Sequence, residues 1–156
     1  GPLAYGKVGS LEGYASGAGI RQLASAKLRE AWARGERVAI CATEADLGAL
    51  DVAALADAAR AGDSLARFVC ELSGYQLGRG IAILADVLDP ETVVIGGIYT
   101  RCRDLLEAPM LRGFNLEALP GATASCNVVP AALGEAIGDF GALAIVFEPL
   151  HSEVVR

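Results

Sequence analysis

One carboxylate near the start of the chain has the position and the chemistry to contact a small polar ligand. Glu12 lies in a glycine-rich stretch, residues 1–17, just before a predicted helix. A carboxylate at this point has two interpretations: it caps the helix, or it accepts hydrogen bonds from the hydroxyl groups of a ligand. Spacing alone favours capping. The glycines around Glu12 predict a loop over roughly the first half of the stretch.

Two adjacent glycines form a second candidate site. Gly96 and Gly97 follow the β-branched run Thr92–Ile95, which comes after Pro90 and predicts a buried strand. In α/β proteins ligands bind beyond the carboxyl ends of strands, where a missing Cβ lets a ligand approach the backbone. A tight turn is the alternative interpretation, and short motifs of this kind favour it.

Side chains that bind metals or form disulfides are sparse. The four cysteines are widely spaced, without a Cys-x-x-Cys pair, and the sequence has no signal-peptide pattern. We expect reduced thiols that pack as small apolar side chains: Cys41, Cys70, Cys102 and Cys126. The only histidine, His151, lies near the carboxyl end.

Composition excludes several classes of function. The formal net charge of −6 argues against a nucleic-acid-binding surface within these residues. No run approaches the ~18 consecutive apolar residues that a membrane helix needs, so we expect a soluble, cytoplasmic protein. Of the 156 residues, 53% are hydrophobic and 21% charged. That is more apolar surface than a lone domain of this length usually covers, so we expect part of it to face a missing segment or a partner.

Caps and periodicity predict the helices that position the candidate residues. Three helices are expected to begin after N-cap residues: Ser16 for the first, Asp51 for the second, and Asp63 or Ser64 for the third. They are expected to end at or before Gly35, Gly62 and Pro90. The last of them is the long central helix. Its expected core-facing stripe follows a three-four spacing: Leu65, Phe68, Val69, Leu72, Gln76, Arg79 and Ile83.

Beyond Gly97 the pattern is less regular. Thr100 is expected to cap a helix that Pro109 breaks, and residues 114–123 predict a turn-rich connection. Residues 125–129 predict a second strand, and residues 133–147 predict an apolar helix whose glycines favour tight packing. The predicted fold class is α/β, helix-rich with few strands.

Four stretches occur in the order typical of one protein family. They are G-K-V-G-S-L-E-G-Y-A-S-G-A-G-I, D-V-A-A-L-A-D-A-A-R-A-G-D-S-L-A, D-P-E-T-V-V-I-G-G and A-A-L-G-E-A-I-G-D-F-G-A-L-A. Together they span nearly the whole chain, which resembles the C-terminal half of the ROK family (repressors, open reading frames and sugar kinases). The resemblance implies part of the large lobe of an actin-like (ribonuclease H-like) ATPase fold. Residues 1–156 would be the C-terminal portion of a ROK domain whose N-terminal lobe is absent.

The resemblance also implies the roles of the candidate residues. Glu12 would contact the hydroxyl groups of a bound hexose, and Gly96 and Gly97 would lie at the nucleotide site. The family holds a structural zinc through an upstream histidine and three cysteines in the pattern C-x-C-G-x-x-G-C-x-E. Here the residues at the cysteine positions are Leu3, Tyr5 and Ser10, so we expect no zinc site.

No residue of the chain matches the aspartate that in family kinases deprotonates the sugar hydroxyl. We therefore expect no catalytic residue in this chain, and no phosphorylation by the chain alone. In the intact protein that base and the phosphate-binding loops would come from the N-terminal lobe.

The resemblance favours one function and leaves two others open. The stretch L-E-G-Y-A-S-G-A-G-I is similar to the kinase branch, so the leading hypothesis is an ATP-dependent sugar kinase. The intact protein would use ATP and Mg to phosphorylate a hexose or an N-acetylhexosamine, as a homodimer. The alternative is the sugar-sensing effector domain of a ROK transcriptional regulator. A degenerate structural domain, which the missing zinc ligands favour, is a third possibility.

Overall fold

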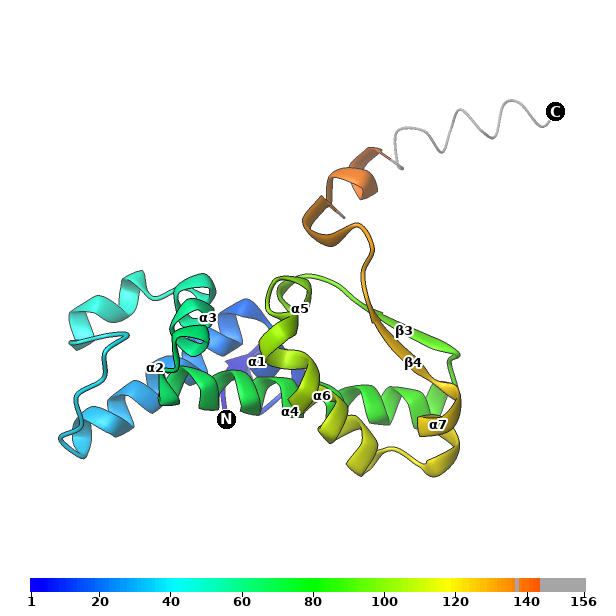
Figure 1. Cartoon of the computed structure of the whole chain (residues 1–156), viewed down its shortest axis with the longest axis horizontal. Helices are drawn as coiled ribbons and strands as arrows, with labels where there is room; N and C mark the ends of the chain where they lie inside the picture. The colour runs from blue at the N-terminus through cyan, green and yellow to red at the C-terminus, as the bar shows by residue number, and fades with distance from the viewer. Residues whose placement is uncertain (137, 144–156) are drawn as a thin grey trace.

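A long helix, α4 (Ser64–Leu88), runs through the middle of the computed structural model (Figure 1). The structure describes residues 1–136 and 138–143. Asp63 caps α4 because its side chain accepts a hydrogen bond from the Ala66 amide at 2.9 Å. The helix ends at Leu88, and its C-cap residue Asp89, with φ 46°, stands directly before Pro90. The predicted central helix is confirmed.

The remaining elements surround α4. Before it come β1 (Leu3–Ala4), β2 (Lys7–Val8), α1 (Leu11–Ala15), α2 (Gly17–Ala33), the 3₁₀ helix η1 (Glu44–Ala49) and α3 (Val52–Ala61). After it come β3 (Thr92–Ile95), α5 (Ile98–Arg101), α6 (Arg103–Glu117), α7 (Pro120–Ser125), β4 (Asn127–Pro130) and the 3₁₀ helix η2 (Gly134–Ala136). Ser16 caps α2 and Asp51 caps α3, as predicted.

Helices α4 and α6 pack closely because glycines lie where the two helices meet. A Cβ on Gly78 would overlap the Met110 carbonyl oxygen, and one on Gly113 would overlap the Tyr75 carbonyl oxygen. A Cβ on Gly74 would lie 2.6 Å from the Leu106 carbonyl oxygen. The glycines inside the predicted helix therefore permit a backbone-to-backbone approach that no other residue allows.

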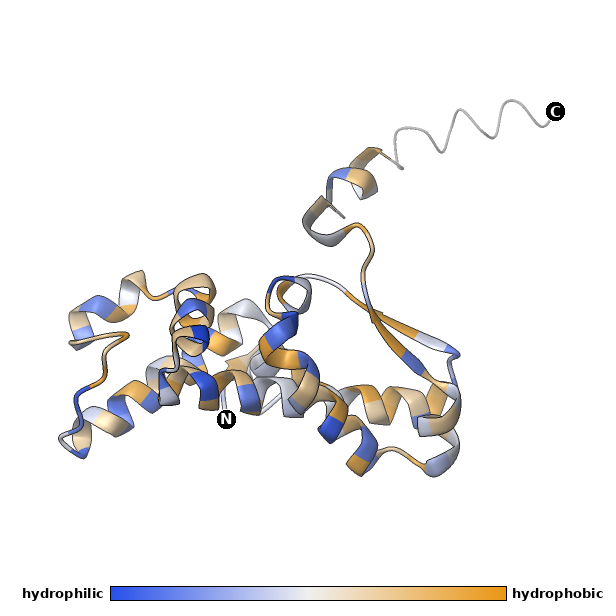
Figure 2. Ribbon diagram, in the orientation of Figure 1, coloured by the Kyte–Doolittle hydropathy of each residue, from blue (hydrophilic) through white to orange (hydrophobic). Residues whose placement is uncertain are grey.

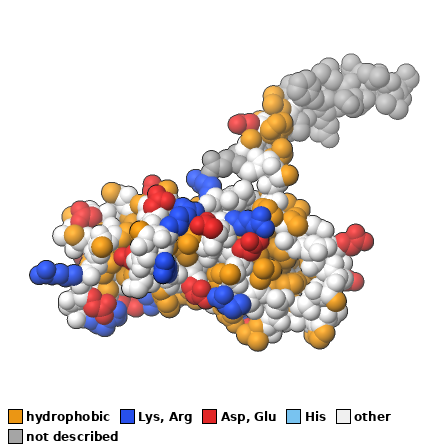
Figure 3. Space-filling view, viewed as in Figure 1, with side chains coloured by type: hydrophobic (Ala, Val, Ile, Leu, Met, Phe, Trp, Pro, Cys, Tyr) orange, Lys and Arg blue, Asp and Glu red, His pale blue; other side chains and the backbone are white. Residues whose placement is uncertain are grey.

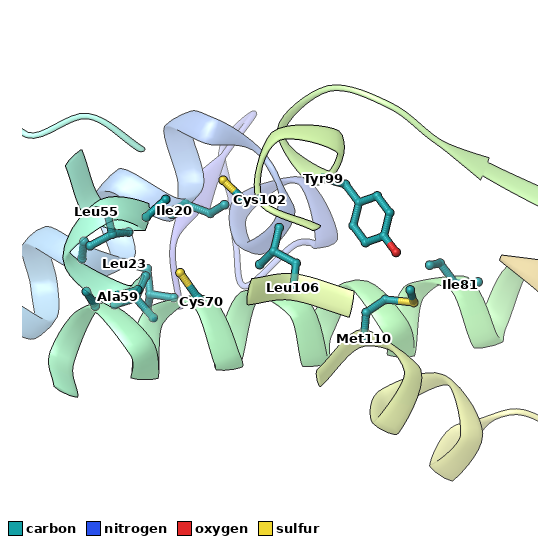
Figure 4. Packing of buried hydrophobic residues seen from close by; sticks show 14 of the residues in the cluster. Ile20, Leu23, Leu55, Ala59, Cys70, Ile81, Tyr99, Cys102, Leu106 and Met110 are labelled. Atoms are coloured by element: carbon teal, nitrogen blue, oxygen red, sulfur yellow. The ribbon is translucent and has the colours of Figure 1, made fainter. Parts of the chain in front are cut away.

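The buried core lies where α2, α3, α5 and α6 meet α4. Figure 4 shows these apolar side chains packed between the helices, and Figure 2 shows the mixture of hydrophobic and hydrophilic residues along each ribbon. The larger members of the core are Ile20, Leu23, Leu28, Leu55, Tyr99, Leu106 and Met110. All four cysteines are buried and free, as predicted.

The two predicted strands beyond α4 form one parallel pair, but β3 is not buried as predicted, since Val94 is 62% exposed, and β4 begins at Asn127 because Ser125 belongs to α7. β3 pairs with β4 in the register Thr92↔Asn127 to Ile95↔Pro130. β1 and β2 form a separate antiparallel hairpin within the stretch predicted as loop. Its turn residues Tyr5 and Gly6 have φ values of 48° and 73°, which are typical of a two-residue type I′ turn. The loop prediction is therefore wrong at this hairpin.

The predicted core-facing stripe of α4 is wrong in part. Val69 is fully buried, but Phe68 is 48% exposed and Ile83 is 65% exposed. The buried face consists mainly of small residues: Ala66, Cys70, Ser73, Gly74, Gly78, Ala82 and Ala85. Close packing against α6 requires small side chains on that face, so the largest apolar residues of α4 do not mark it.

Pro109 does not break its helix, contrary to the prediction. α6 continues through Pro109 to Glu117, and its N-cap is Cys102, because Thr100 lies inside α5. Pro109 is buried against α4 beside Gly74, and this packing offsets the lost backbone hydrogen bond.

The prediction of a turn-rich connection over residues 114–123 is wrong as well. α7 begins with Pro120, a residue typical of the first helical position. The Leu119 amide before it donates to the Asp86 carboxylate at 2.9 Å. Of the predicted helix over residues 133–147, η2 is a 3₁₀ helix and residues 138–143 are helical. Residues 137 and 144–147 lie outside the described part.

Several large apolar side chains are exposed on the described surface. They include Val87 at 75%, Leu116 at 72%, Leu88 at 68% and Leu119 at 62%. Figure 3 shows hydrophobic side chains at the surface between charged ones. This exposure fits the apolar composition. Within residues 1–136 and 138–143, no helix has the length and hydropathy to span a membrane.

Candidate functional site

Glu12 is the second residue of α1, a helix of five residues. Ser10 caps α1, because its Oγ accepts a hydrogen bond from the Gly13 amide at 3.2 Å, and Ser16 caps α2 in the same way. The N-cap residues are therefore Ser10 and Ser16, and Glu12 lies in the first turn of α1, where a carboxylate interacts favourably with the helix dipole. Glu12 is exposed, and its carboxylate has no hydrogen bond or ion pair with any residue that the structure describes. Its oxygens are available as acceptors.

Contacts from α2 and α4 hold the backbone of α1. A helix of five residues is not stable on its own, so its position depends on its neighbours. Ser73 of α4 donates a hydrogen bond from Oγ to the Tyr14 carbonyl oxygen at 2.8 Å. A Cβ on Gly19 of α2 would overlap the Gly13 carbonyl oxygen, so α1 and α2 touch backbone to backbone. The helix that carries Glu12 is thus fixed from two sides.

Gly96 and Gly97 join the carboxyl end of β3 to the start of α5 (Figure 1). Gly97 has φ 63° and ψ −132°, which other residues rarely adopt, and a Cβ on it would meet no atom within 4 Å. Its backbone is therefore open. This is the edge of a parallel sheet at which α/β proteins bind ligands.

A cavity of about 560 Å³ lies beside this turn, between the amino ends of α2 and α3 and helix α5. Its volume is in the range of small-molecule sites. Its lining includes Gly17 and Ala18 of α2, Val52 and Ala53 of α3, and Ile98 of α5. Its charged lining residues are Arg21, Asp51, Asp57, Arg60 and Arg101. Arg21 can contact an anionic group on the ligand, whereas Arg60 is paired with Asp57 and Asp104 and Asp51 caps α3.

Arg60 connects the wall of this cavity to α6. Its Nε and Nη2 atoms donate to the two carboxylate oxygens of Asp104 at 2.8 and 2.9 Å. Its Nη1 donates to Asp57 at 3.1 Å, and Nη2 also donates to the Arg101 carbonyl oxygen at 3.2 Å. The hydrogen bond from Arg60 lowers the pKa of Asp104. Figure 3 shows the charged side chains of both signs over the region of α3, α5 and α6.

Neither Glu12 nor the Gly96–Gly97 pair is itself in the lining of the cavity. Gly17, which follows α1, and Ile98, which follows Gly97, are in it. The Gly96–Gly97 pair is thus beside the cavity, whereas Glu12 lies on α1, five residues before Gly17. Arg60 and Asp104 were not predicted, because partners 44 residues apart leave no local signal in the sequence.

The positions of the missing zinc ligands have other structural uses. Leu3 is in β1, Tyr5 is in the hairpin turn and Ser10 caps α1. Within residues 1–136 and 138–143, no three His, Cys, Asp or Glu side chains are grouped so that they could hold a metal ion. His151 lies outside the described residues. The absence of zinc stays a prediction.

Comparison with known families assigns the chain. The model of the ROK family matches residues 4–148. The chain belongs to the ROK family. Two curated ROK relatives are glucokinases: that of Halalkalibacterium halodurans is 34% identical over 141 residues, and that of Thermotoga maritima is 30% identical over 143 residues. These matches cover 90% and 92% of the chain but 41% and 44% of the relatives. The chain therefore spans less than half the length of either glucokinase.

Solved ROK structures share the fold. A ROK family glucokinase from Streptomyces griseus, in complex with glucose and AMPPNP, has a TM-score of 0.72 and 26% identity over 90% of this chain and 45% of that chain. A ROK family transcriptional regulator, a homologue of the E. coli MLC protein, has a TM-score of 0.67 and 26% identity over 83% of this chain and 31% of that chain. The chain is thus part of the large lobe of an actin-like ATPase fold, helix-rich with few strands.

Proposed function

We propose that this chain is the C-terminal portion of an ATP-dependent ROK sugar kinase. The observation that carries the proposal is the similarity to two glucokinases over 90% and 92% of the chain. The substrate is a hexose or an N-acetylhexosamine, and the intact protein acts in the cytoplasm as a homodimer. Its N-terminal lobe lies outside this chain.

Glu12 is the proposed sugar-binding residue. An exposed carboxylate without a protein partner can accept hydrogen bonds from two sugar hydroxyls, and charge-assisted bonds of this kind are stronger than neutral ones. The backbone contacts under α1 support this role, because they fix the helix from which the carboxylate extends. The solved glucokinase with glucose bound supports a sugar as the ligand.

Gly96 and Gly97 are the proposed nucleotide-binding residues. The open backbone of Gly97 lets a phosphate or a ribose approach the main chain. The adjacent cavity has the size of a small-molecule site, and its lining includes Arg21. Mg²⁺ bound with ATP would neutralise charge on the phosphates, as in other phosphoryl-transfer enzymes. The base that deprotonates the sugar hydroxyl is proposed to come from the N-terminal lobe.

Measuring ADP formation by the full-length protein, with glucose, ATP and Mg²⁺, tests this function. We expect glucose-dependent ADP formation in the wild type. Gly97→Ala should weaken nucleotide binding, because a side chain strains this backbone conformation and fills the space in front of it. Gly35→Ala is the matched control, since Gly35 also has a positive φ, 76°, and open space, but follows the end of α2 and not the end of β3. Equal nucleotide affinity in both variants would contradict the nucleotide site.

A sugar-sensing regulator is the second candidate, favoured by the similarity to the solved ROK regulator. In that case the full-length protein binds glucose without forming ADP. It also binds DNA, and the sugar changes its DNA affinity. Gel-shift titrations with and without glucose, run beside the ADP assay, separate the two functions.

A further inference from the structure

Ser73 is the one buried polar side chain among the residues that the structure describes, with 1% of its surface exposed. It lies in the middle of α4, on the face of small residues that packs against the rest of the molecule. A buried hydroxyl needs a hydrogen-bond partner, and a serine inside a helix commonly finds one in its own helix. Ser73 instead donates across to α1, to the Tyr14 carbonyl oxygen at 2.8 Å.

The acceptor of this bond lies in the last turn of α1, where carbonyl groups lack partners within the helix. The Glu12 carbonyl oxygen accepts from the Ser16 amide at 3.0 Å, and the Tyr14 carbonyl oxygen accepts from Ser73. The other contacts that hold α1 are between apolar groups or backbone atoms: Leu11 packs over Gly80, and Gly13 packs against Gly19. Ser73 therefore provides the directional bond between α1 and α4.

We infer that Ser73 is a positioning residue for the Glu12 carboxylate, an inference that rests on the proposed function. The Glu12 side chain has no partner among the described residues, so the position of α1 decides the region that its oxygens can reach. Without the Ser73 hydroxyl, the Tyr14 carbonyl oxygen loses its partner and α1 can move relative to α4. Sugar binding then weakens although Ser73 does not touch the sugar.

The test is a double-mutant cycle in the full-length protein, with glucose as the probe and calorimetry as the readout. S73A lowers the affinity for glucose by about five- to tenfold, which is about 1 to 1.4 kcal/mol. In the E12Q background the same substitution changes the affinity by less than about twofold, because Ser73 acts through the carboxylate. Equal losses in both backgrounds, or no loss in either, overturn the inference.

A second measurement distinguishes a displaced α1 from a general loss of stability of the protein. S73A accelerates amide hydrogen exchange in residues 11–15. Ile81→Val, a core substitution on α4 beside Tyr99 and Met110 (Figure 4), does not. Unchanged exchange in S73A overturns the inference.

The affinities also distinguish this inference from the function on which it rests. A loss from E12Q with no loss from S73A overturns the inference alone. No loss from E12Q overturns the proposed sugar site and, with it, the role of Ser73 in binding.

Discussion

The buried cysteines of this molecule are unreactive, whereas the charged side chains proposed to contact ligands are exposed. Cys70 and Cys102 are buried between α4 and the segment after Gly97, whereas Glu12 and Arg21 are exposed. Burial raises the pKa of the Cys70 thiol to about 11 and also raises that of Cys102. The thiols therefore behave as small apolar side chains and not as nucleophiles.

This difference predicts slow thiol chemistry in the folded protein. With a pKa of about 11, roughly one Cys70 side chain in a thousand is a thiolate at pH 8. We expect a thiol reagent such as DTNB to modify Cys70 and Cys102 slowly at pH 8 and rapidly once guanidinium unfolds the chain. Mass spectrometry of partly modified protein identifies the sites. Rapid modification of Cys70 in the folded state would contradict the packing of α4.

At the scale of elements, close backbone contacts between helices determine the packing more than the large apolar side chains do. The crossing of α4 and α6 depends on Gly74, Gly78 and Gly113, whose hydrogen atoms leave room for the carbonyl groups of the opposite helix. The ion pair of Arg60 and Asp104 joins α3 to α6. These contacts connect the helices around the cavity to α4.

Substituting Gly78 tests the crossing. Gly78→Ala should destabilise the protein by about 1–3 kcal/mol, because the new methyl group overlaps the Met110 carbonyl oxygen and forces α6 away. Gly121→Ala in α7 is the matched control. A Cβ on Gly121 meets no atom within 4 Å, so alanine there should be neutral or stabilise by up to ~1 kcal/mol. Urea unfolding of both variants measures the difference, and equal midpoints would contradict the close packing.

The ion pair of Arg60 and Asp104 predicts a dependence of stability on pH. Arg60 lowers the pKa of Asp104 in the folded state. The pair therefore contributes stability above the unfolded pKa of about 3.9, and this contribution is lost as the pH falls through the lower folded pKa. Asp104→Asn should lower the thermal midpoint at pH 7, and the gap to the wild type should narrow below about pH 4. An equal difference in thermal midpoint between the wild type and Asp104→Asn at pH 7 and at pH 3 would contradict this contribution of the ion pair.

The sequence predicted the elements better than their contacts. Asp51, Asp63 and Ser16 mark helix starts through local capping, and the β-branched run Thr92–Ile95 marks a strand, so these were found correctly. The continuation of α6 through Pro109 depends on packing against α4, which is not a local property. For the same reason the pair of Arg60 and Asp104 and the bond from Ser73 to Tyr14 could not be found in the sequence.

At the scale of the whole molecule, the chain covers part of the length of its relatives and leaves apolar side chains exposed. It spans less than half the length of the two glucokinases, with 41% and 44% coverage. Parallel sheets are usually covered by other elements on both faces. The two-stranded parallel sheet of β3 and β4 leaves side chains exposed. Val94 on β3 is 62% exposed and Val87 on α4 is 75% exposed. We propose that the remainder of the ROK domain, and the second copy in a homodimer, cover such surfaces.

The proposed function predicts that the 156-residue chain alone does not phosphorylate hexoses. Positioning of the transferred phosphate and the base both depend on the N-terminal lobe in the proposed function. A coupled assay with the purified chain, glucose, ATP and Mg²⁺ should show no ADP formation above that of a blank. The full-length protein is the positive control. Robust turnover by the chain alone would contradict the proposal that the N-terminal lobe supplies the base and positions the transferred phosphate.

The most direct test of the sugar site is the affinity of the full-length protein for glucose with and without the Glu12 carboxylate. Hydrogen bonds to a charged group are worth about 1.5 to 3 kcal/mol each, so Glu12→Gln should weaken glucose binding roughly ten- to a hundredfold. The thermal midpoint should change little, because Glu12 is exposed and the helix caps are Ser10 and Ser16. Calorimetry and thermal unfolding of both proteins supply the two quantities. Unchanged glucose affinity with a lowered midpoint would contradict the assignment of Glu12 to a sugar site.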